Sequence, residues 1–251
     1  MLVSIIIPTF NSEKTLKDNL ESIKQQSYTN YEIIIIDNNS NDKTIKIIQE
    51  NNFKNIKIIV EKDRGIYDAI NKGIMNSNGD IISILHSDDF YFDKNVLDKV
   101  TNIFSLNEDS NIVYGDLIYV DKENINSILR YWKPGHFKDG AFLKGWHPPH
   151  PSFFAKKKLL IENSLYNIEI GNCADVELMH RLLQINKIKS YYLNKTLVSM
   201  RYGGKSNKNI KNIIKQNIEI IKFLKIKNNY LKIIIFLWYK LFDRLKQFVI
   251  R

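Results

Sequence analysis

Short apolar runs and segments of helical periodicity alternate along the first part of the chain. The runs are rich in Ile and have the length of buried strands, and the first three are each followed by a segment with apolar residues at helical spacing. Near-continuous apolar strands between amphipathic helices predict an α/β fold, a mostly parallel Rossmann-like sheet flanked by helices and built by right-handed crossovers. Strands are expected at 2–7, 31–36, 56–60 and 81–85, and helices at 12–26, around 45–48 and at 66–76.

A polar cluster follows each of these four strands. The clusters are 9–11, 37–40, 63–65 and 87–89. Because the carboxyl ends of parallel strands meet at one edge of a sheet, all four are expected to converge there, and ligands of such sheets bind at that edge. The convergence of carboxylates and an arginine therefore predicts a binding site.

The stretch 80–92 carries the sharpest chemical signal. Asp88 and Asp89 end the fourth strand, and paired carboxylates suit a divalent cation that holds a phosphorylated substrate. An ordinary solvated turn is the alternative, since Ser and Asp are common loop residues. Asp37 could accept a hydrogen bond from a nucleobase. Arg64 could bind a phosphate or pair with a neighbouring aspartate.

The second half of the chain is less regular. A helix is expected at 93–106, and the alternation at 111–120 and 127–132 predicts a pair of antiparallel strands. The proline-rich loop 147–152 is rigid because proline fixes φ and blocks ladder hydrogen bonds. Further expected elements are a strand at 152–155, a helix from 156, a helix at 174–183 with Asp175 in its first turn, and strands at 188–193 and 197–201.

Two lysine-rich helices are expected at the end of the chain, at 209–224 and 230–251. The second carries an apolar stripe, but its uninterrupted apolar core is far shorter than the roughly 20 residues that span a bilayer. A helix lying in the membrane interface is favoured, with packing on the domain or on a second subunit as the alternative. The stripe comprises Tyr230, Ile233, Ile234, Leu237, Leu241, Leu245 and Phe248. The expected domains are 1–204, with halves 1–92 and 93–204, and a basic tail at 205–251.

Composition narrows the class of protein. The 251 residues are 44% hydrophobic, enough for a substantial core, and the single cysteine excludes an intrachain disulfide. The N-terminus carries no export signal, so a cytoplasmic protein is expected. From residue 201 on, 13 basic residues face two acidic ones, whereas the first 200 residues hold 24 basic and 25 acidic groups. The basic tail favours an anionic membrane or nucleic acid as partner.

The absence of two known nucleotide-binding motifs argues against some enzyme classes. No Walker A loop and no Gly-x-Gly-x-x-Gly follows any strand, so neither an ATPase nor a dinucleotide enzyme is indicated. Instead, an ordered series of motifs resembles the family 2 glycosyltransferases of the GT-A fold, in their bacterial surface-polysaccharide branch. The similarity covers about residues 2–206. The motifs lie at 4–11, 36–42, 63–73, 79–89, 149–154, 174–178 and 200–206.

The resemblance implies roles for individual residues. Asp37 matches the carboxylate that reads a uracil-type base, Asp89 the ligand of Mn²⁺ or Mg²⁺, and Asp175 the general base of inverting members. Ser87 stands where the first aspartate of the acidic motif might be, so only the last carboxylate need touch metal. Asp175 could equally be a helix-capping residue. The remaining nucleotide-sugar residues that the motifs imply are Thr9, Phe10, Asn11, Asn38, Arg64, Asp68 and Asp88, with His150 and Arg201 as acceptor or donor contacts.

The expected function is inverting, metal-dependent transfer of a sugar from a nucleotide donor, with UDP favoured, to a glycan or lipid-linked acceptor. The enzyme is expected on the inner face of the cell membrane, with a homodimer as a further assembly. A nucleotidyltransferase is one alternative, although the glycine-rich, lysine-bearing loop of that class is missing after the first strand. A basic nucleic-acid-binding protein is another. The tail confines its aromatic residues to the apolar stripe, so no nucleic-acid partner is expected.

Overall fold

The computed structural model describes residues 1–107, 109–203 and 210–249. The first half contains β1 (Val3–Thr9), α1 (Leu16–Lys24), β2 (Tyr31–Asp37), α2 (Thr44–Glu50), β3 (Ile56–Val60), α3 (Ile66–Met75), β4 (Ile81–Ile84), β5 (Asp89–Tyr91) and α4 (Val96–Leu106). The second half contains β6 (Ile112–Val120), β7 (Ile128–Trp132), β8 (Phe153–Lys156), α5 (Lys157–Glu162), α6 (Ala174–His180), β9 (Ser190–Arg201), α7 (Ile210–Phe223) and α8 (Tyr230–Val249). Short 3₁₀ helices lie at Ala141–Lys144, His150–Ser152 and Ile168–Ile170, and a π turn extends α6 at Arg181–Ile185.

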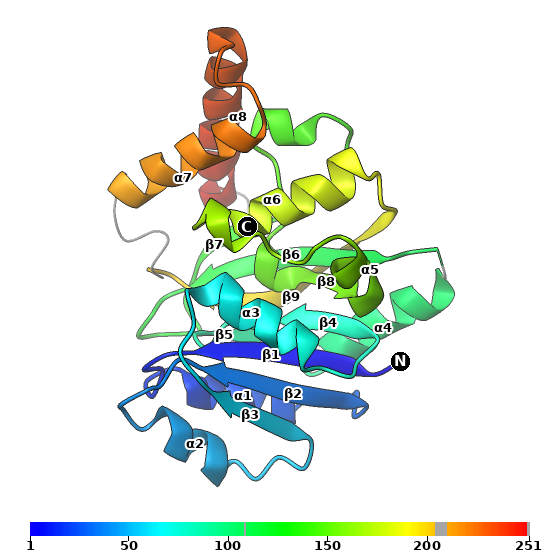
Figure 1. Cartoon of the computed structure of the whole chain (residues 1–251), viewed down its shortest axis with the longest axis vertical. Coiled ribbons are helices and arrows are strands. Elements are labelled where there is room, and N and C mark those ends of the chain that lie inside the picture. The colour runs from blue at the N-terminus through cyan, green and yellow to red at the C-terminus, as the bar shows by residue number, and fades with distance from the viewer. Residues whose placement is uncertain (108, 204–209, 250–251) are drawn as a thin grey trace.

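One sheet runs through the molecule, in the order β3-β2-β1-β4-β8-β6-β9-β5, with β7 paired to β6. Strands β1 to β4 are parallel, as expected, so their carboxyl ends meet at one edge (Figure 1). Strand β8 runs antiparallel to both β4 and β6 and joins this parallel part to the second half. Strands β6 and β7 are antiparallel, which confirms the predicted pair.

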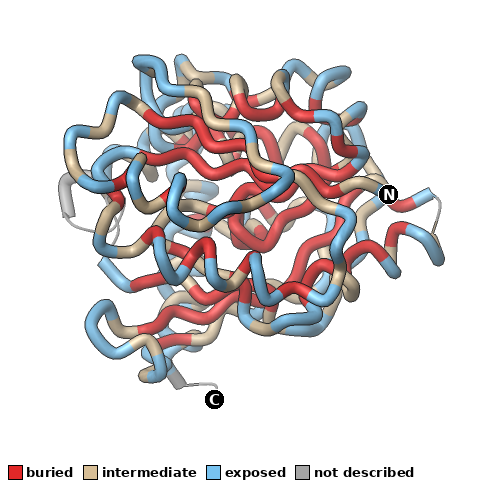
Figure 2. Tube along the Cα trace, turned by 90° about the horizontal axis from the view of Figure 1, so that it is seen from below, coloured by how far each residue is buried: buried red, intermediate tan, exposed pale blue. Residues whose placement is uncertain are grey.

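Two hydrophobic cores lie on the two faces of the sheet. Alternate strand residues point to opposite faces, so that Ile5 and Ile7 pack with α1, α2 and α4 while Ile6 packs with α3, α5 and α6. The buried strands form the interior of the trace and the helices expose their outer sides (Figure 2). This double coverage accounts for the near-continuous apolar sequence of the first strands.

Two sequence expectations are wrong in detail. The segments 188–193 and 197–201 form one strand, β9, whose register against β6 shifts around Asp116 and so absorbs the polar interruption between them. Strand β5 was not expected, because three residues carry too little periodicity. It pairs with the end of β9, which places Asp89 opposite Met200 and inside the sheet rather than on an exposed loop tip.

Helix α8 packs on the domain with an unexpected face. Phe236 is 1% exposed, and of the predicted stripe only Ile233 is partly buried. The other stripe residues face outward, because α8 turns its charged side toward the body of the protein. No helix in the described ranges is long and apolar enough to cross a bilayer. The expected domain boundary at 204/205, residues Gly204 to Ser206 of the last motif and the expected helix start at Asn209 lie outside the described residues.

Candidate active site

The loops after β1 and β2 are joined through Asp37. Its Oδ2 accepts hydrogen bonds from Thr9 Oγ1 at 2.8 Å and Ser40 Oγ at 2.6 Å, and its Oδ1 accepts one from the Ser40 amide at 2.8 Å. Asp37 is 0% exposed. In this structure Asp37 therefore organises the loop, and its carboxylate has no surface open to a nucleobase.

Three residues near Asp37 form the accessible rim of these loops. Phe10 is 49% exposed. Asn11 has a φ of 50° and its side-chain oxygen accepts a hydrogen bond from the Asn41 amide at 3.0 Å, which holds the two loops together. Asn38 is half-buried, and its Oδ1 accepts a hydrogen bond from the Asp63 amide at 3.0 Å. The rim is therefore accessible to solvent, whereas the carboxylate of Asp37 is not.

Arg64 lies at the end of the loop after β3 and is mostly solvent-exposed. Its guanidinium is 4.0 Å from Asp68, with side chains 73% and 15% exposed respectively. Asp68 also accepts a hydrogen bond from the Arg64 amide at 3.0 Å and pairs with Lys72 at 3.5 Å. An exposed pair of this length is weak, so Arg64 can exchange this partner for a phosphate at little cost.

The acidic pair after β4 is split between two environments. Asp88 is half-buried, whereas Asp89 is 0% exposed and neither of its carboxylate oxygens has a hydrogen-bond partner in the described part of the chain. Burial and the neighbouring Asp88 raise the pKa of Asp89 well above its ordinary value, against a smaller lowering effect of Arg201. Asp88 thus has the more accessible carboxylate, and Asp89 is a buried one without a partner.

The turn that carries these aspartates is tied to its neighbours. Ser12 and Ser87 share a hydrogen bond of 2.7 Å between their hydroxyls, which links this turn to the loop after β1. Arg201, at the end of β9, donates to the carbonyl of Asp88 at 2.7 Å and forms an ion pair with Asp18. Arg201 is 5% exposed and therefore positions the acidic turn.

A cavity of about 450 Å³ lies between the sheet, the start of α6 and α8. Asp175, Tyr67, His86 and His150 line one part of it. Thr9, Asp37, Arg64, Asp88 and Asp89 are not among its lining residues, although His86 directly precedes the acidic turn. The structure thus brings Asp175 and His150 into one cavity, whereas the predicted nucleotide and metal residues lie outside its lining.

Hydrogen bonds and ring contacts hold the side chains around Asp175. Tyr67 Oη donates to Asp175 Oδ1 at 2.9 Å, and the Tyr67 ring stacks on Tyr166 with centroids 5.5 Å apart. His150 Nε2 is 2.8 Å from Tyr166 Oη, and its ring lies 5.5 Å from that of His86. These contacts fix the position of the Asp175 carboxylate at the cavity wall.

The proton states of this group follow from burial. Burial and the nearby Asp175 raise the pKa of Tyr67 well above its ordinary value, so the phenol stays a hydrogen-bond donor. Burial likewise lowers the pKa of His86 and, with His86 as neighbour, lowers that of His150 well below the usual range. Both imidazoles are therefore neutral at pH 7.

The acidic turn could hold a divalent ion only if phosphate oxygens or water complete the coordination shell. No group of three or more His, Cys, Asp or Glu side chains within the described ranges is placed to hold a metal ion. The buried carboxylate of Asp89 has two oxygens without a hydrogen-bond partner, which suits coordination. Mn²⁺ or Mg²⁺ commonly takes one or two carboxylates and completes its shell with phosphate oxygens and water. Asp88 and Asp89 fit that pattern.

Several cavity residues escaped sequence reasoning. Tyr67 lies within a quoted motif, but its contact with Asp175 joins residues 108 positions apart. The basic lining from β7 and α8 includes Arg130, Lys240 and Arg244, and the sequence predicts these segments only as a paired strand and a basic helical tail. Position alone gave a signal for His86, which stands between the fourth strand and the acidic pair.

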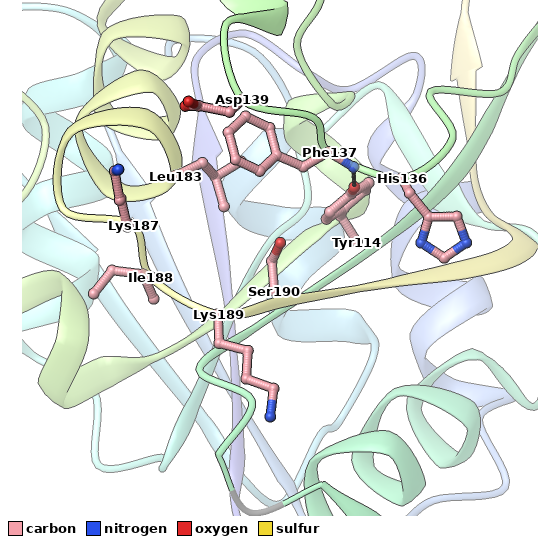
Figure 3. A pocket seen from close by; sticks show the side chains of 9 residues that line it. All are labelled: Tyr114, His136, Phe137, Asp139, Leu183, Lys187, Ile188, Lys189 and Ser190. Atoms are coloured by element: carbon pink, nitrogen blue, oxygen red, sulfur yellow. Dashed lines mark hydrogen bonds between the residues drawn. The ribbon is translucent and has the colours of Figure 1, made fainter.

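A second cavity, of about 360 Å³, lies on another part of the second half. Tyr114, Phe137 and Leu183 form its apolar wall, and the Phe137 amide donates to Tyr114 Oη at 2.8 Å (Figure 3). Lys187 and Asp139 lie at its rim (Figure 3). It shares no lining residue with the cavity of Asp175, so it has no direct part in that site.

Sequence comparison finds glycosyltransferases among the proteins similar to this chain. A PGL/p-HBAD biosynthesis glycosyltransferase of Mycobacterium bovis is 27% identical over 210 residues, which cover 82% of this chain and 79% of the relative. An uncharacterized glycosyltransferase of Rickettsia conorii is 34% identical over 134 residues, 53% of this chain but only 22% of that protein.

Solved structures show the same fold at lower identity. Staphylococcus aureus TarS 1–349 in complex with UDP-GlcNAc superimposes with a TM-score of 0.64 at 17% identity, over 88% of this chain and 67% of that one. The mannosyltransferase PcManGT from Pyrobaculum calidifontis, in complex with GDP-Man and Mn²⁺, has a TM-score of 0.64 at 15% identity, over 96% and 69%. The chain spans about two-thirds of these structures, and the predicted GT-A fold is confirmed.

The sequence profile of Glycosyl transferase family 2 matches residues 4–159, more than half of the chain. The match takes in the strands β1 to β4 and the acidic turn. The chain therefore belongs to glycosyl transferase family 2 and is a glycosyltransferase.

Proposed function

We propose that the protein is an inverting, metal-dependent glycosyltransferase in which Asp175 is the general base. The observation that carries this is the Asp175 carboxylate at the wall of the cavity, fixed by the 2.9 Å hydrogen bond from Tyr67. An acceptor hydroxyl in the cavity would give its proton to Asp175 as its oxygen attacks the anomeric carbon. General-base catalysis of this kind typically contributes ~10²–10⁴-fold.

One displacement step inverts the configuration at the anomeric carbon. The acceptor oxygen forms the new bond while the bond from carbon to diphosphate breaks, and the nucleoside diphosphate leaves with the electron pair. Tyr67 keeps its own proton because its pKa is raised, so the proton of the acceptor ends on Asp175. The neutral His86 and His150 offer hydrogen bonds to the sugar from the same cavity.

Asp88 and Asp89 are the proposed holders of Mn²⁺ or Mg²⁺. A bound divalent ion supplies stabilisation of the negative charge that develops on the leaving diphosphate. Support comes from the partnerless carboxylate of Asp89 and from the likeness to PcManGT, whose structure contains Mn²⁺. The choice of Asp89 as the main ligand stays a prediction, since Asp88 has the more accessible carboxylate.

UDP is the proposed nucleotide of the donor, bound along the rim made by Phe10, Asn11 and Asn38, with Arg64 near the phosphates. Thr9, Asp37 and Asp68 would hold this surface in shape through the hydrogen bonds described above. The UDP-GlcNAc complex of TarS supports uridine, whereas the GDP-Man complex of PcManGT keeps guanosine as the competing base.

The proposed acceptor is a glycan or lipid-linked glycan of bacterial surface-polysaccharide synthesis, used by a peripheral enzyme at the inner face of the membrane. Helix α8 supports this, because it exposes a row of large apolar side chains: Trp238 is 67% exposed, and Leu241 and Leu245 are each 57% exposed. The segment from residue 201 also carries 13 basic against two acidic residues. An exposed apolar row within a basic segment suits an anionic bilayer surface.

Product analysis tests the proposed activity. Incubation with a panel of UDP- and GDP-sugars and Mn²⁺ is expected to release nucleoside diphosphate, and addition of EDTA is expected to stop the release. A nucleotidyltransferase would instead release pyrophosphate from a nucleoside triphosphate and a sugar phosphate. Pyrophosphate release without turnover of any nucleotide sugar would contradict the proposal.

A further inference from the structure

Basic side chains dominate the part of the cavity between β7 and α8. Arg130 and Lys133 approach from β7 and the residue after it, and Lys240 and Arg244 approach from α8. These four residues are called the cation cluster below. Two carboxylates, Asp175 and Asp243, line the same cavity. The basic groups therefore outnumber the acidic ones.

The folded protein does not neutralise two of these charges by ion pairs. Arg130 is 5% exposed, lies 4.2 Å over the ring of Tyr119 and donates from Nε to Gln247 at 2.7 Å. Lys240 Nζ donates to Asn217 at 2.7 Å. Neither has a carboxylate within ion-pair distance in the described part of the chain.

Burial, together with mutual repulsion, makes this arrangement costly. Burial and the charge of Arg244 lower the pKa of Lys240 to about 8, and burial lowers that of Arg130, with Arg244 adding to the effect. Buried cations are normally paired with an anion, because desolvation of an isolated charge costs several kcal/mol or more. A cavity that keeps such a cluster is suited to bind an anionic ligand.

The position of the cluster identifies which part of the reaction it serves. The rim residue Asn11, Arg64 and the acidic Asp88, which are the proposed contacts of the donor, do not line this cavity. Asp175 does line it, and its charge acts on Lys240. The cluster is thus on the acceptor side of the proposed general base. Helix α8 carries half of the cluster on one face and the exposed apolar row on the other.

We infer that the cation cluster binds a phosphate or diphosphate group of the acceptor, beside the hydroxyl that faces Asp175. This rests on the proposed function, and it adds that the acceptor is anionic. A diphosphate that links a sugar to a lipid and a phosphate within a soluble polymer share this chemistry. The apolar row of α8 on the opposite face favours the lipid-linked form.

Binding of farnesyl diphosphate, farnesol and inorganic pyrophosphate by calorimetry tests the inference. UDP and Mn²⁺ are present at saturating concentration, so that the donor site is filled. Wild type is expected to bind farnesyl diphosphate and not farnesol. Lys240→Met and Arg244→Gln are each expected to weaken this binding about 10-fold or more, the usual effect of losing one charge-assisted contact. If pyrophosphate binds as tightly as farnesyl diphosphate, the cation cluster recognises the phosphate groups and the lipid adds nothing to binding.

Lys133→Gln provides a variant that removes a cation from the more accessible side of the cavity, in case the buried substitutions prevent folding. Lys232→Gln is the matched control, since it removes one exposed charge from α8 outside the cavity. Equal affinity of all cluster variants and wild type would overturn the inference. So would equal binding of farnesol, or no binding of farnesyl diphosphate by wild type.

Nucleotide-sugar hydrolysis, measured on the same samples, separates this inference from the proposed function. Hydrolysis that persists while diphosphate binding is missing contradicts only the cation cluster. Diphosphate binding by a protein that consumes no nucleotide sugar contradicts only the proposed reaction.

Discussion

At the scale of single residues, the ionisable side chains of Asp89 and Lys240 form no ion pair within the described part of the chain, and both lie near the proposed reaction centre. Asp89 has two oxygens without a hydrogen-bond partner in the described structure, and Lys240 has a pKa lowered to about 8. Buried groups of this kind reduce stability unless a ligand completes them. Each therefore gives a test in which stability and ligand binding change separately.

Asp89→Asn is expected to leave the apo protein as stable as wild type. The raised pKa of Asp89 favours its neutral form, and an amide has nearly the same shape. Mn²⁺ with UDP is expected to raise the Tm of wild type by mass action but not that of the variant. Thermal-shift curves with and without Mn²⁺ and UDP measure this. An equal rise in both proteins would remove Asp89 as a metal ligand.

Lys240 predicts a pH dependence of stability. Its pKa is 10.5 unfolded and about 8 folded, so the unfolded chain binds more protons between these values and stability rises with pH from about 8 to 10.5. Arg244 lowers this pKa, whereas Cys173 and Asp175 oppose the shift. Lys240→Met is expected to be more stable than wild type at pH 7, by up to about 3 kcal/mol, and to lose this advantage as the pH approaches 10. Urea denaturation in phosphate-free buffer at pH 7, 8.5 and 9.5 measures it, and a constant difference would contradict it.

At the scale of elements, α8 is held against the 3₁₀ helix Ala141–Lys144 by a close backbone approach. Gly145 has a φ of 72°, and a Cβ there would meet Lys240 Cβ at 2.7 Å and the Phe236 carbonyl at 3.2 Å. Gly140 has a φ of 75° but nothing within 4 Å of its Cβ position. The two glycines thus share the backbone strain and differ in contact with α8.

Gly145→Ala is expected to displace α8, and Gly140→Ala is the matched control. Both substitutions should cost about 1 kcal/mol for the left-handed backbone. Only Gly145→Ala should lower the Tm further and weaken farnesyl diphosphate binding, because Lys240 moves with the helix. Urea denaturation and calorimetry of both variants measure this. Equal effects of the two substitutions would show that α8 is not fixed at Gly145.

Helices and strands were predicted from the sequence where the local apolar pattern matches the burial of the element in the fold. The strand Ile56–Val60 was predicted to the residue, and the other early strands to within two residues, because apolar runs between turn residues leave few alternatives. Strand β5 was missed because its formation depends on pairing with β9, which follows more than 100 residues later. The face of α8 that packs on the domain could not be predicted, because an amphipathic pattern does not say which face contacts the protein.

Candidate residues can be named from the sequence, but their surroundings cannot. The motifs point to Asp88, Asp89, Asp175 and His150, because the acidic pair follows a predicted strand, Asp175 opens a predicted helix and His150 stands between two prolines. Sequence gave no sign that Asp37 is fully buried, nor that Arg201 binds the acidic turn from β9. Both facts depend on contacts between distant segments, which no local pattern contains.

At the scale of the whole molecule, one side of the cavity of Asp175 is the helix α8, whose other side is apolar and exposed. The substitutions Trp238→Ser, Leu241→Ser and Leu245→Ser, combined, are expected to abolish cosedimentation with vesicles containing phosphatidylglycerol, because they remove most of the apolar area that would enter the interface. Leu106→Ser, at an 80% exposed position on α4, is the control. Sedimentation velocity of the same proteins separates the alternative: a wild-type dimer that the triple variant converts to monomer, without vesicle binding, would assign the apolar row to a second subunit.

The central claim is that the carboxylate at the start of α6 is the base of the transfer reaction. The most direct measurement is the rate of nucleoside diphosphate release by Asp175→Asn and Glu177→Gln, with the nucleotide sugar that wild type consumes fastest. Glu177 lies on the same helix, pairs with Arg181 at 2.9 Å and does not line the cavity. Asp175→Asn is expected to lose ~10²–10⁴-fold in rate with unchanged affinity for UDP, while Glu177→Gln retains wild-type turnover. Wild-type turnover by Asp175→Asn, or equal losses in both folded variants, would contradict the account.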